Sequence, residues 1–152
     1  MKLNITVVFL VFAALVSGCG KSSRNPAELT PQHGGVIVEL GDNHKHQLEV
    51  VLDRKEGSIF LHVFDAQNKK RVLTSNEGLE LQVAVGSAES RFLILDPGSN
   101  TATEEIAGNT SFFRRLDTEW LKTKEPVKIV VDQIIVRGSR YQKVEILLPA
   151  SQ

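Results

Sequence analysis

Cysteine is almost absent from this chain of 152 residues, which holds only one, Cys19. A lone cysteine cannot form a disulfide within its own chain, so no internal bridge can hold the fold together. Aromatic residues are also few, with a single tryptophan, Trp120, and a single tyrosine, Tyr141. A chain of this length can still bury enough apolar surface to fold without bridges or metals. We therefore expect one domain with an ordinary hydrophobic core.

Net charge is absent as well, because 18 basic residues balance 18 acidic ones. Proteins that bind the phosphate backbone of nucleic acids need clusters of lysine and arginine. The densest basic runs here are residues 69–71 and the pair Arg114 and Arg115, which is typical of solvated turns. Nucleic acid is therefore not an expected partner.

Catalytic motifs are a further absence. The sequence contains no Gly-x-Ser-x-Gly elbow, no His-Glu-x-x-His, no glycine-rich phosphate loop and no Cys-x-x-Cys. The acidic pair Glu104 and Glu105 falls in a predicted loop, where solvated carboxylates are the default. These observations predict that the protein is not an enzyme.

No apolar run reaches the roughly 20 residues that a transmembrane helix needs. Residues 5–16 are apolar apart from Thr6 and follow Lys2, which is the pattern of a secretory signal. Small residues, Ser17 and Gly18, then precede Cys19. This ending resembles a bacterial lipobox, which implies that Cys19 is diacylated and that a signal peptide of residues 1–18 is removed. An ordinary secretory signal followed by an unrelated cysteine is the alternative.

The lipobox resemblance implies a membrane-anchored lipoprotein that faces the periplasm or the cell exterior. Gly20 stands where an aspartate often marks retention in the inner membrane, so the resemblance favours the outer membrane in a host that has one. Residues 19–31 are polar and show no apolar periodicity, and we interpret them as the lipidated cysteine and a flexible tether. The folded domain is then expected over residues 32–152.

Apolar residues alternate with a period of two through this domain, which predicts β-strands. The predicted strands are residues 36–40, 48–52, 59–64, 79–85, 92–95, 127–136 and 141–148. Segment 59–64 is apolar on both faces, which indicates an interior strand. Only residues 116–122 look helical, with Asp117 or Thr118 as the cap. The pattern favours an all-β, antiparallel, immunoglobulin-like sandwich of about seven strands with one short helix, and a small open barrel is the main alternative.

Two of the four histidines, His44 and His46, are separated by one residue. On a strand, side chains at this spacing point the same way with Cα atoms roughly 6–7 Å apart. Imidazole is a good ligand for zinc and copper, so this pair is a candidate metal site to which Glu49 or Asp42 adds an oxygen. A polar turn that carries two solvated histidines is the alternative.

The other two histidines are expected to lie elsewhere. If the first two strands form a hairpin around residues 41–44, His33 lies opposite Asp53, roughly 23 Å along the strand from His46. His62 stands between two phenylalanines on one strand face, which is typical of a packed, hydrogen-bonded side chain rather than of a ligand.

Residues 33–73 carry a family resemblance. They begin His-Gly-Gly-Val-Ile-Val-Glu-Leu-Gly-Asp-Asn-His and continue through Glu-Val-Val-Leu-Asp to Phe-Leu-His-Val-Phe-Asp-Ala-Gln-Asn-Lys-Lys-Arg-Val. This segment resembles the amino-terminal domain of some periplasmic adaptor subunits of heavy-metal efflux pumps, and short uncharacterised lipoproteins of planctomycete type. The positions that match are His33, Gly34, Gly35, Gly41, His44 and Glu49. The resemblance implies that His33 joins the metal ligands, and that an efflux-system or envelope protein is a partner.

Together these features predict a lipid-anchored, non-enzymatic binding module for a divalent transition metal, copper or zinc, in metal homeostasis or efflux. The predicted ligands are His44, His46 and Glu49, with His33 added by the resemblance. A structural or protein-interaction lipoprotein without metal is the alternative, and a small hydrolase is a third reading.

The anchor can be tested by removing its thiol. Replacing Cys19 with alanine should abolish acyl labelling and detergent partitioning, because the lipid has no other attachment point. Metabolic labelling with a fatty-acid analogue and membrane fractionation measure both effects. A Cys19→Ala protein that still fractionates with membranes as wild type does would refute the lipobox interpretation.

Overall fold

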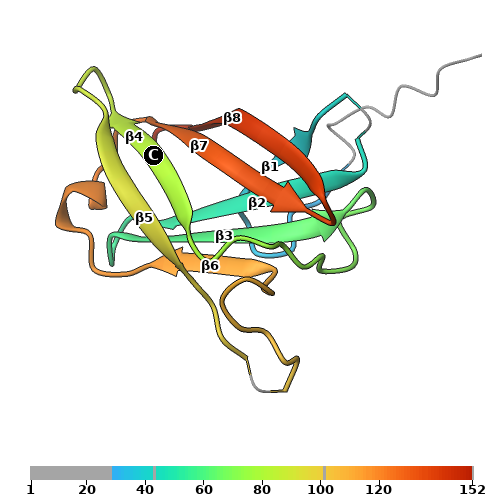
Figure 1. Ribbon diagram of the computed structural model, residues 1–152. Coiled ribbons are helices and arrows are strands. Elements are labelled where there is room, and N and C mark those ends of the chain that lie inside the picture. The colour runs from blue at the N-terminus through green and yellow to red at the C-terminus, as the bar shows by residue number, and fades with distance from the viewer. Residues whose placement is uncertain (1–28, 43, 101, 152) are drawn as a thin grey trace, which may run out of the picture.

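The computed structural model describes residues 29–42, 44–100 and 102–151. Eight strands form one antiparallel sheet in the order β1-β2-β3-β6-β5-β4-β7-β8 (Figure 1). The strands are β1 (Val36–Leu40), β2 (His46–Asp53), β3 (Ser58–Asp65), β4 (Leu79–Val85), β5 (Arg91–Pro97), β6 (Phe112–Arg115), β7 (Val127–Val136) and β8 (Ser139–Leu148). A 3-10 turn, η2 (Glu119–Leu121), is the only helical element in these ranges. No helix among the described residues is long and apolar enough to cross a membrane.

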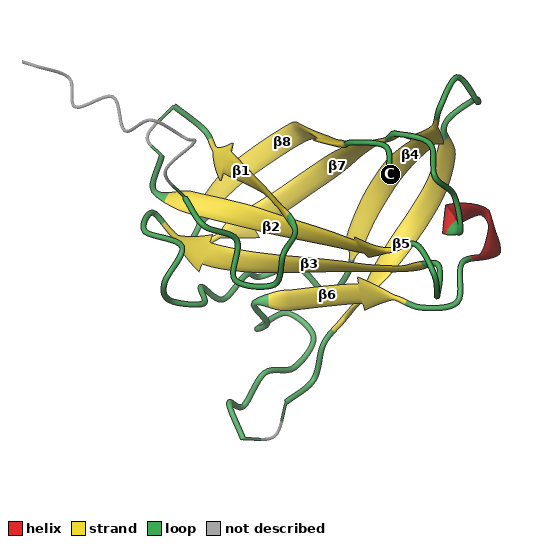
Figure 2. Ribbon diagram, turned by 180° about the vertical axis from the view of Figure 1, so that it is seen from behind, coloured by secondary structure: helices red, strands yellow, loops and turns green. Residues whose placement is uncertain are grey.

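The sheet folds back on itself. Strands β1, β2, β3 and β6 make one half and face β4, β5, β7 and β8 across the core (Figures 1 and 2). The halves are joined where β5 pairs with β6, through Asp96 opposite Arg114 and Pro97 opposite Phe113. On the other side β1 contacts β8 without pairing with it, so the sheet is nearly closed.

The expectation of an all-β, antiparallel domain is confirmed, but its details differ. The described residues form eight strands rather than about seven, and a single nearly closed sheet replaces the two separate sheets of an immunoglobulin-like sandwich. The additional strand is β6, whose four residues are too few to show an alternating pattern. The predicted helix over residues 116–122 shrinks to the three residues of η2, and Thr118 precedes it without a side-chain cap.

Two local predictions are confirmed by the strand pairing. The β1–β2 hairpin has Leu40 opposite His46 and Val36 opposite Val50, which is the predicted register. Strand β3 lies between β2 and β6, so it is interior as its two apolar faces indicated. Phe64 on β3 is therefore almost fully buried, and Leu48 on the neighbouring strand β2 is fully buried.

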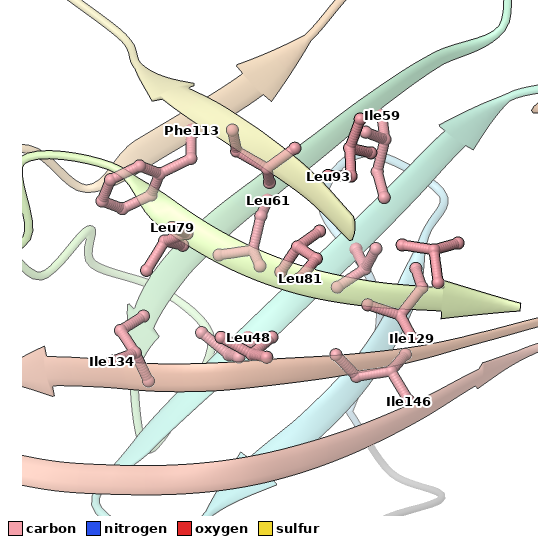
Figure 3. Close-up of a cluster of buried hydrophobic side chains, with 14 of the residues drawn as sticks. Leu48, Ile59, Leu61, Leu79, Leu81, Leu93, Phe113, Ile129, Ile134 and Ile146 are labelled. Atoms are coloured by element: carbon pink, nitrogen blue, oxygen red, sulfur yellow. The ribbon is translucent and has the colours of Figure 1, made fainter. Parts of the chain in front are cut away.

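The core fills the space between the two halves of the sheet (Figure 3). Alternate residues of each strand point inward, because successive side chains of a strand lie on opposite faces. The labelled side chains that meet there are Leu48, Ile59, Leu61, Leu79, Leu81, Leu93, Phe113, Ile129, Ile134 and Ile146. Each buried side chain of this size contributes about 1.5–3 kcal/mol relative to exposure, and the sum holds the two halves together.

A matched pair of leucine substitutions tests this core. Leu81 on β4 is 0% exposed, whereas Leu147 on β8 is 65% exposed. Leu81→Ala should lower the free energy of unfolding by about 2–5 kcal/mol, because it removes apolar contacts and leaves a cavity. Leu147→Ala should change it by less than about 0.5 kcal/mol. Urea unfolding curves measure both values, and equal losses would contradict the assignment of inward and outward faces.

Candidate functional site

The residues that precede β1 cross the outer face of β2 and β3. We call this segment, residues 29–35, the strap. The side chain of Asn68 donates a hydrogen bond to the Thr30 carbonyl at 2.9 Å, and the Gln32 side chain donates one to the Asn68 carbonyl. Gly35 lies directly on β2, since a Cβ built there would come within 2.4 Å of the Val50 carbonyl oxygen. Only glycine lets the strap approach the strand this closely.

Glu49 on β2 fastens the strap. Its side chain is 0% exposed, and it accepts hydrogen bonds from the backbone N–H groups of Gln32 at 3.1 Å, His33 at 2.6 Å and Gly35 at 3.1 Å. The Nδ1 atom of His33 lies 3.1 Å from the same carboxylate. Burial by itself raises the pKa of Glu49, but the hydrogen bonds from His33, Gly35 and Gln32 outweigh it, so the pKa lies below its usual value. Glu49 is therefore an ionised, fully hydrogen-bonded anchor at neutral pH.

The strap also places the ring of His33 on the ring of His62. Their centroids are 3.9 Å apart and their planes differ by 3°, and Phe112 stacks on His62 at 4.7 Å. His62 is 7% exposed, which confirms that it is a packed side chain, although its Nδ1 has no hydrogen-bond partner among the described residues. Burial, followed by the nearby charges of His33 and Arg71, lowers the pKa of His62 to about 4. His62 is therefore neutral at physiological pH.

His33 does not lie where an extended hairpin would put it. The chain turns at Gly34, whose φ is +76°, and returns over β2 instead of continuing in line with β1. His33 consequently contacts Glu49 rather than lying opposite Asp53. Because Glu49 is three residues from His46 on the same strand, the separation along the strand falls from the expected 23 Å to roughly 10 Å.

His44 and His46 have separate partners. His44 lies in the β1–β2 turn with a φ of +49° and its Nδ1 contacts the Glu39 carboxylate, so it is not on the strand that the two-residue spacing assumed. His46 begins β2 and its Nδ1 lies 3.0 Å from the hydroxyl of Tyr141 on β8. Burial, then the charges of Arg137 and Lys45, lower the pKa of His46. The predicted partner Glu49 accepts hydrogen bonds from the strap instead.

His33 is the side chain of this site with a nitrogen that could bind a metal ion. If its Nδ1–H donates to the Glu49 carboxylate, its Nε2 keeps a lone pair, which is the usual arrangement of a metal-binding histidine and its supporting carboxylate. The ring is 34% exposed, so solutes can reach it. A metal ion lies in the plane of each imidazole that binds it, so two parallel rings 3.9 Å apart cannot share one ion in this arrangement.

Across the described ranges, no group of three or more His, Cys, Asp or Glu side chains is arranged to hold a metal ion. Cys19, the predicted lipidation site, lies outside the described residues.

A comparison with protein-family models, curated proteins and solved structures found no match. The function of the site therefore has to be inferred from its geometry and chemistry.

The buried histidine predicts a pH dependence of stability. The pKa of His62 is about 4 in the folded protein and about 6.5 when unfolded, so the unfolded chain binds more protons between these values. Stability contributed by neutral His62 is full above pH 6.5 and should decline by on the order of 3 kcal/mol as the pH falls towards 4. Phenylalanine keeps the ring stack but cannot titrate, so His62→Phe should flatten this decline.

Urea unfolding between pH 4.5 and 7.5 measures the slope for each protein. His46 should leave a residual slope in the variant, because its pKa is lowered in the same direction. His44→Asn is the matched control, since His44 has an exposed ring and asparagine tolerates its left-handed backbone. Identical slopes for wild type and His62→Phe would show that His62 is not the group responsible.

Proposed function

We propose that this chain is a lipid-anchored, non-enzymatic binding module of the cell envelope, and that it binds copper(II) or zinc weakly through His33. The observation that carries the proposal is the contact between the His33 Nδ1 and the buried Glu49 carboxylate. Such a carboxylate fixes the tautomer and the orientation of a ligating ring. The lipid on Cys19 would hold the module at the membrane.

The electrostatic surroundings support a cation at this place. Glu49 carries a full negative charge at neutral pH, for the reasons given above, and it touches the ligating ring. Arg71 acts in the opposite direction, since its charge disfavours a further cation near His62. One oriented imidazole with water completing the coordination gives weak binding, and copper(II) should bind ahead of zinc by the usual order of divalent ions.

His62, whose ring stacks on that of His33, is the nearest side chain that could act as a second metal ligand. It is neutral at physiological pH, which is the form that metals require, and its Nδ1 lacks a partner among the described residues. It can join His33 on one ion only if the two rings leave their parallel stack. Binding of that kind would disturb the strap, whereas binding by His33 alone would not.

A protein-interaction module without metal is the second candidate, and the outer face of β5 favours it. Phe92 is 78% exposed and Ile94 is 56% exposed, and as alternate residues of one strand they lie on the same face. Large apolar side chains that stand next to each other at the surface often mark a contact with another protein.

Metal titration by calorimetry, on protein without a histidine tag, tests the first proposal. Wild type should bind copper(II) more tightly than zinc, and binding should weaken as the pH falls, because protons compete with the metal for the imidazole nitrogen. His33→Ala should abolish binding. The double variant His44→Ala/His46→Ala is the matched control and should bind as wild type does, because both of these rings have other partners.

Two results would reject this assignment. If the double variant loses binding while His33→Ala retains it, the turn histidines form the site and His33 does not. If wild type gives no heat with either metal at neutral pH, the metal function fails and the interaction role of β5 remains as the proposal.

A further inference from the structure

A hollow lies where β4 ends and β5 begins, away from the strap. Its volume is about 250 Å³, and its lining includes the apolar Val83, Val85 and Ala88 together with Trp120, Arg91 and Glu125. Arg91 is the register partner of Val83, whose side chain is fully buried, so both point to the inner side of the sheet. The hollow is thus the mouth of the nearly closed sheet at this end, a common position for ligand sites in barrels.

Charges in the hollow do not neutralise one another by contact. The guanidinium of Arg91 lies over the ring of Trp120, with its carbon 5.4 Å from the ring centroid. A guanidinium stacked in this way is held by the ring and keeps its N–H groups free for a carboxylate. Glu89 and Glu125 also line the hollow, and none of the ion pairs found among the described residues includes Arg91 or either glutamate.

The part of the lining that carries Glu125 is held in place before any ligand arrives. Arg54 donates hydrogen bonds to the carbonyls of Thr123 and Glu125, both at 2.7 Å, and to the carbonyl of Pro149 at 2.6 Å. These bonds fix the segment that carries Glu125. A Cβ built on Gly86 would come within 1.8 Å of the Glu125 carboxylate, so the glycine leaves the space that this carboxylate occupies. Preorganisation of this kind lowers the entropic cost of binding.

We propose that this hollow binds a free α-amino acid with an apolar side chain of about the size of leucine. Its carboxylate would pair with Arg91 through two parallel hydrogen bonds. Its ammonium would face Glu125 and Glu89, and its side chain would rest on Val85 and Trp120. The cavity volume is slightly below the roughly 300 Å³ at which ligand pockets usually begin, so it suits one amino acid rather than a larger molecule.

Trp120 provides the readout, because it is the only tryptophan of the chain and lines the hollow. Leucine titrated into the purified full chain should change its fluorescence saturably, with a dissociation constant in the region of about 1 mM or below. Leucinamide lacks the carboxylate and N-acetylleucine lacks the ammonium, so each should bind at least about tenfold more weakly. Calorimetry with the same three compounds gives an independent affinity.

Variants with matched controls locate the site. Arg91→Gln should weaken leucine binding at least about tenfold by calorimetry, whereas Arg115→Gln, at an exposed arginine that pairs with Asp96 and does not line the hollow, should not. Glu125→Gln should also weaken it, and Glu80→Gln on an exposed position of β4 is its control. Wild-type affinity in Arg91→Gln, equal binding of N-acetylleucine and leucine, or no saturable response to leucine would each overturn the proposal. Each of these outcomes is independent of the metal titration.

Discussion

The burial of one carboxylate sets the arrangement of a whole face of this protein. An ionised group that leaves water without partners costs several kcal/mol, so a carboxylate as deeply buried as Glu49 has to be surrounded by donors. Three of those donors are backbone N–H groups of the strap, and the fourth is the ring of His33. The path of the strap therefore follows from the need to satisfy Glu49. Once the strap lies there, it covers His62 and makes β3 a strand that is buried on both faces.

Local sequence patterns predicted most of the strands but not the contacts between residues that are far apart in the chain. Alternation of apolar residues identified seven of the eight strands, because inward side chains repeat every second residue wherever a strand is long enough. Strand β6 was not predicted because it has only four residues, of which two are apolar. The β1–β2 register was predictable from a short turn. The position of His33 was not, because it depends on a left-handed turn at Gly34 and on a carboxylate 16 residues away.

Near-closure of the sheet also depends on contacts between residues that are far apart in the chain, and local sequence patterns do not reveal such contacts. His46 and Tyr141 are 95 positions apart, yet their contact joins β2 to β8 beside the place where β1 and β8 come together. Exposed strand edges tend to pair with other chains, and natural proteins keep them short or cover them. Here β1 has only five residues and lies against β8, which limits the free edge. The two-residue spacing of His44 and His46 predicted that both side chains bind one metal ion. In the nearly closed sheet, His46 contacts Tyr141 on β8 instead.

The two candidate sites offer different groups to a ligand. A site that depends on His33 has protons and metal ions competing for one imidazole nitrogen. The hollow around Arg91 instead offers a guanidinium and two carboxylates to the charged ends of an amino acid. The strap crosses β2 and β3, whereas the hollow is built by β4, β5 and η2 and is held by Arg54. Since no lining residue of the hollow belongs to the strap, occupancy of one site need not alter the other, and one small domain can present two independent binding surfaces.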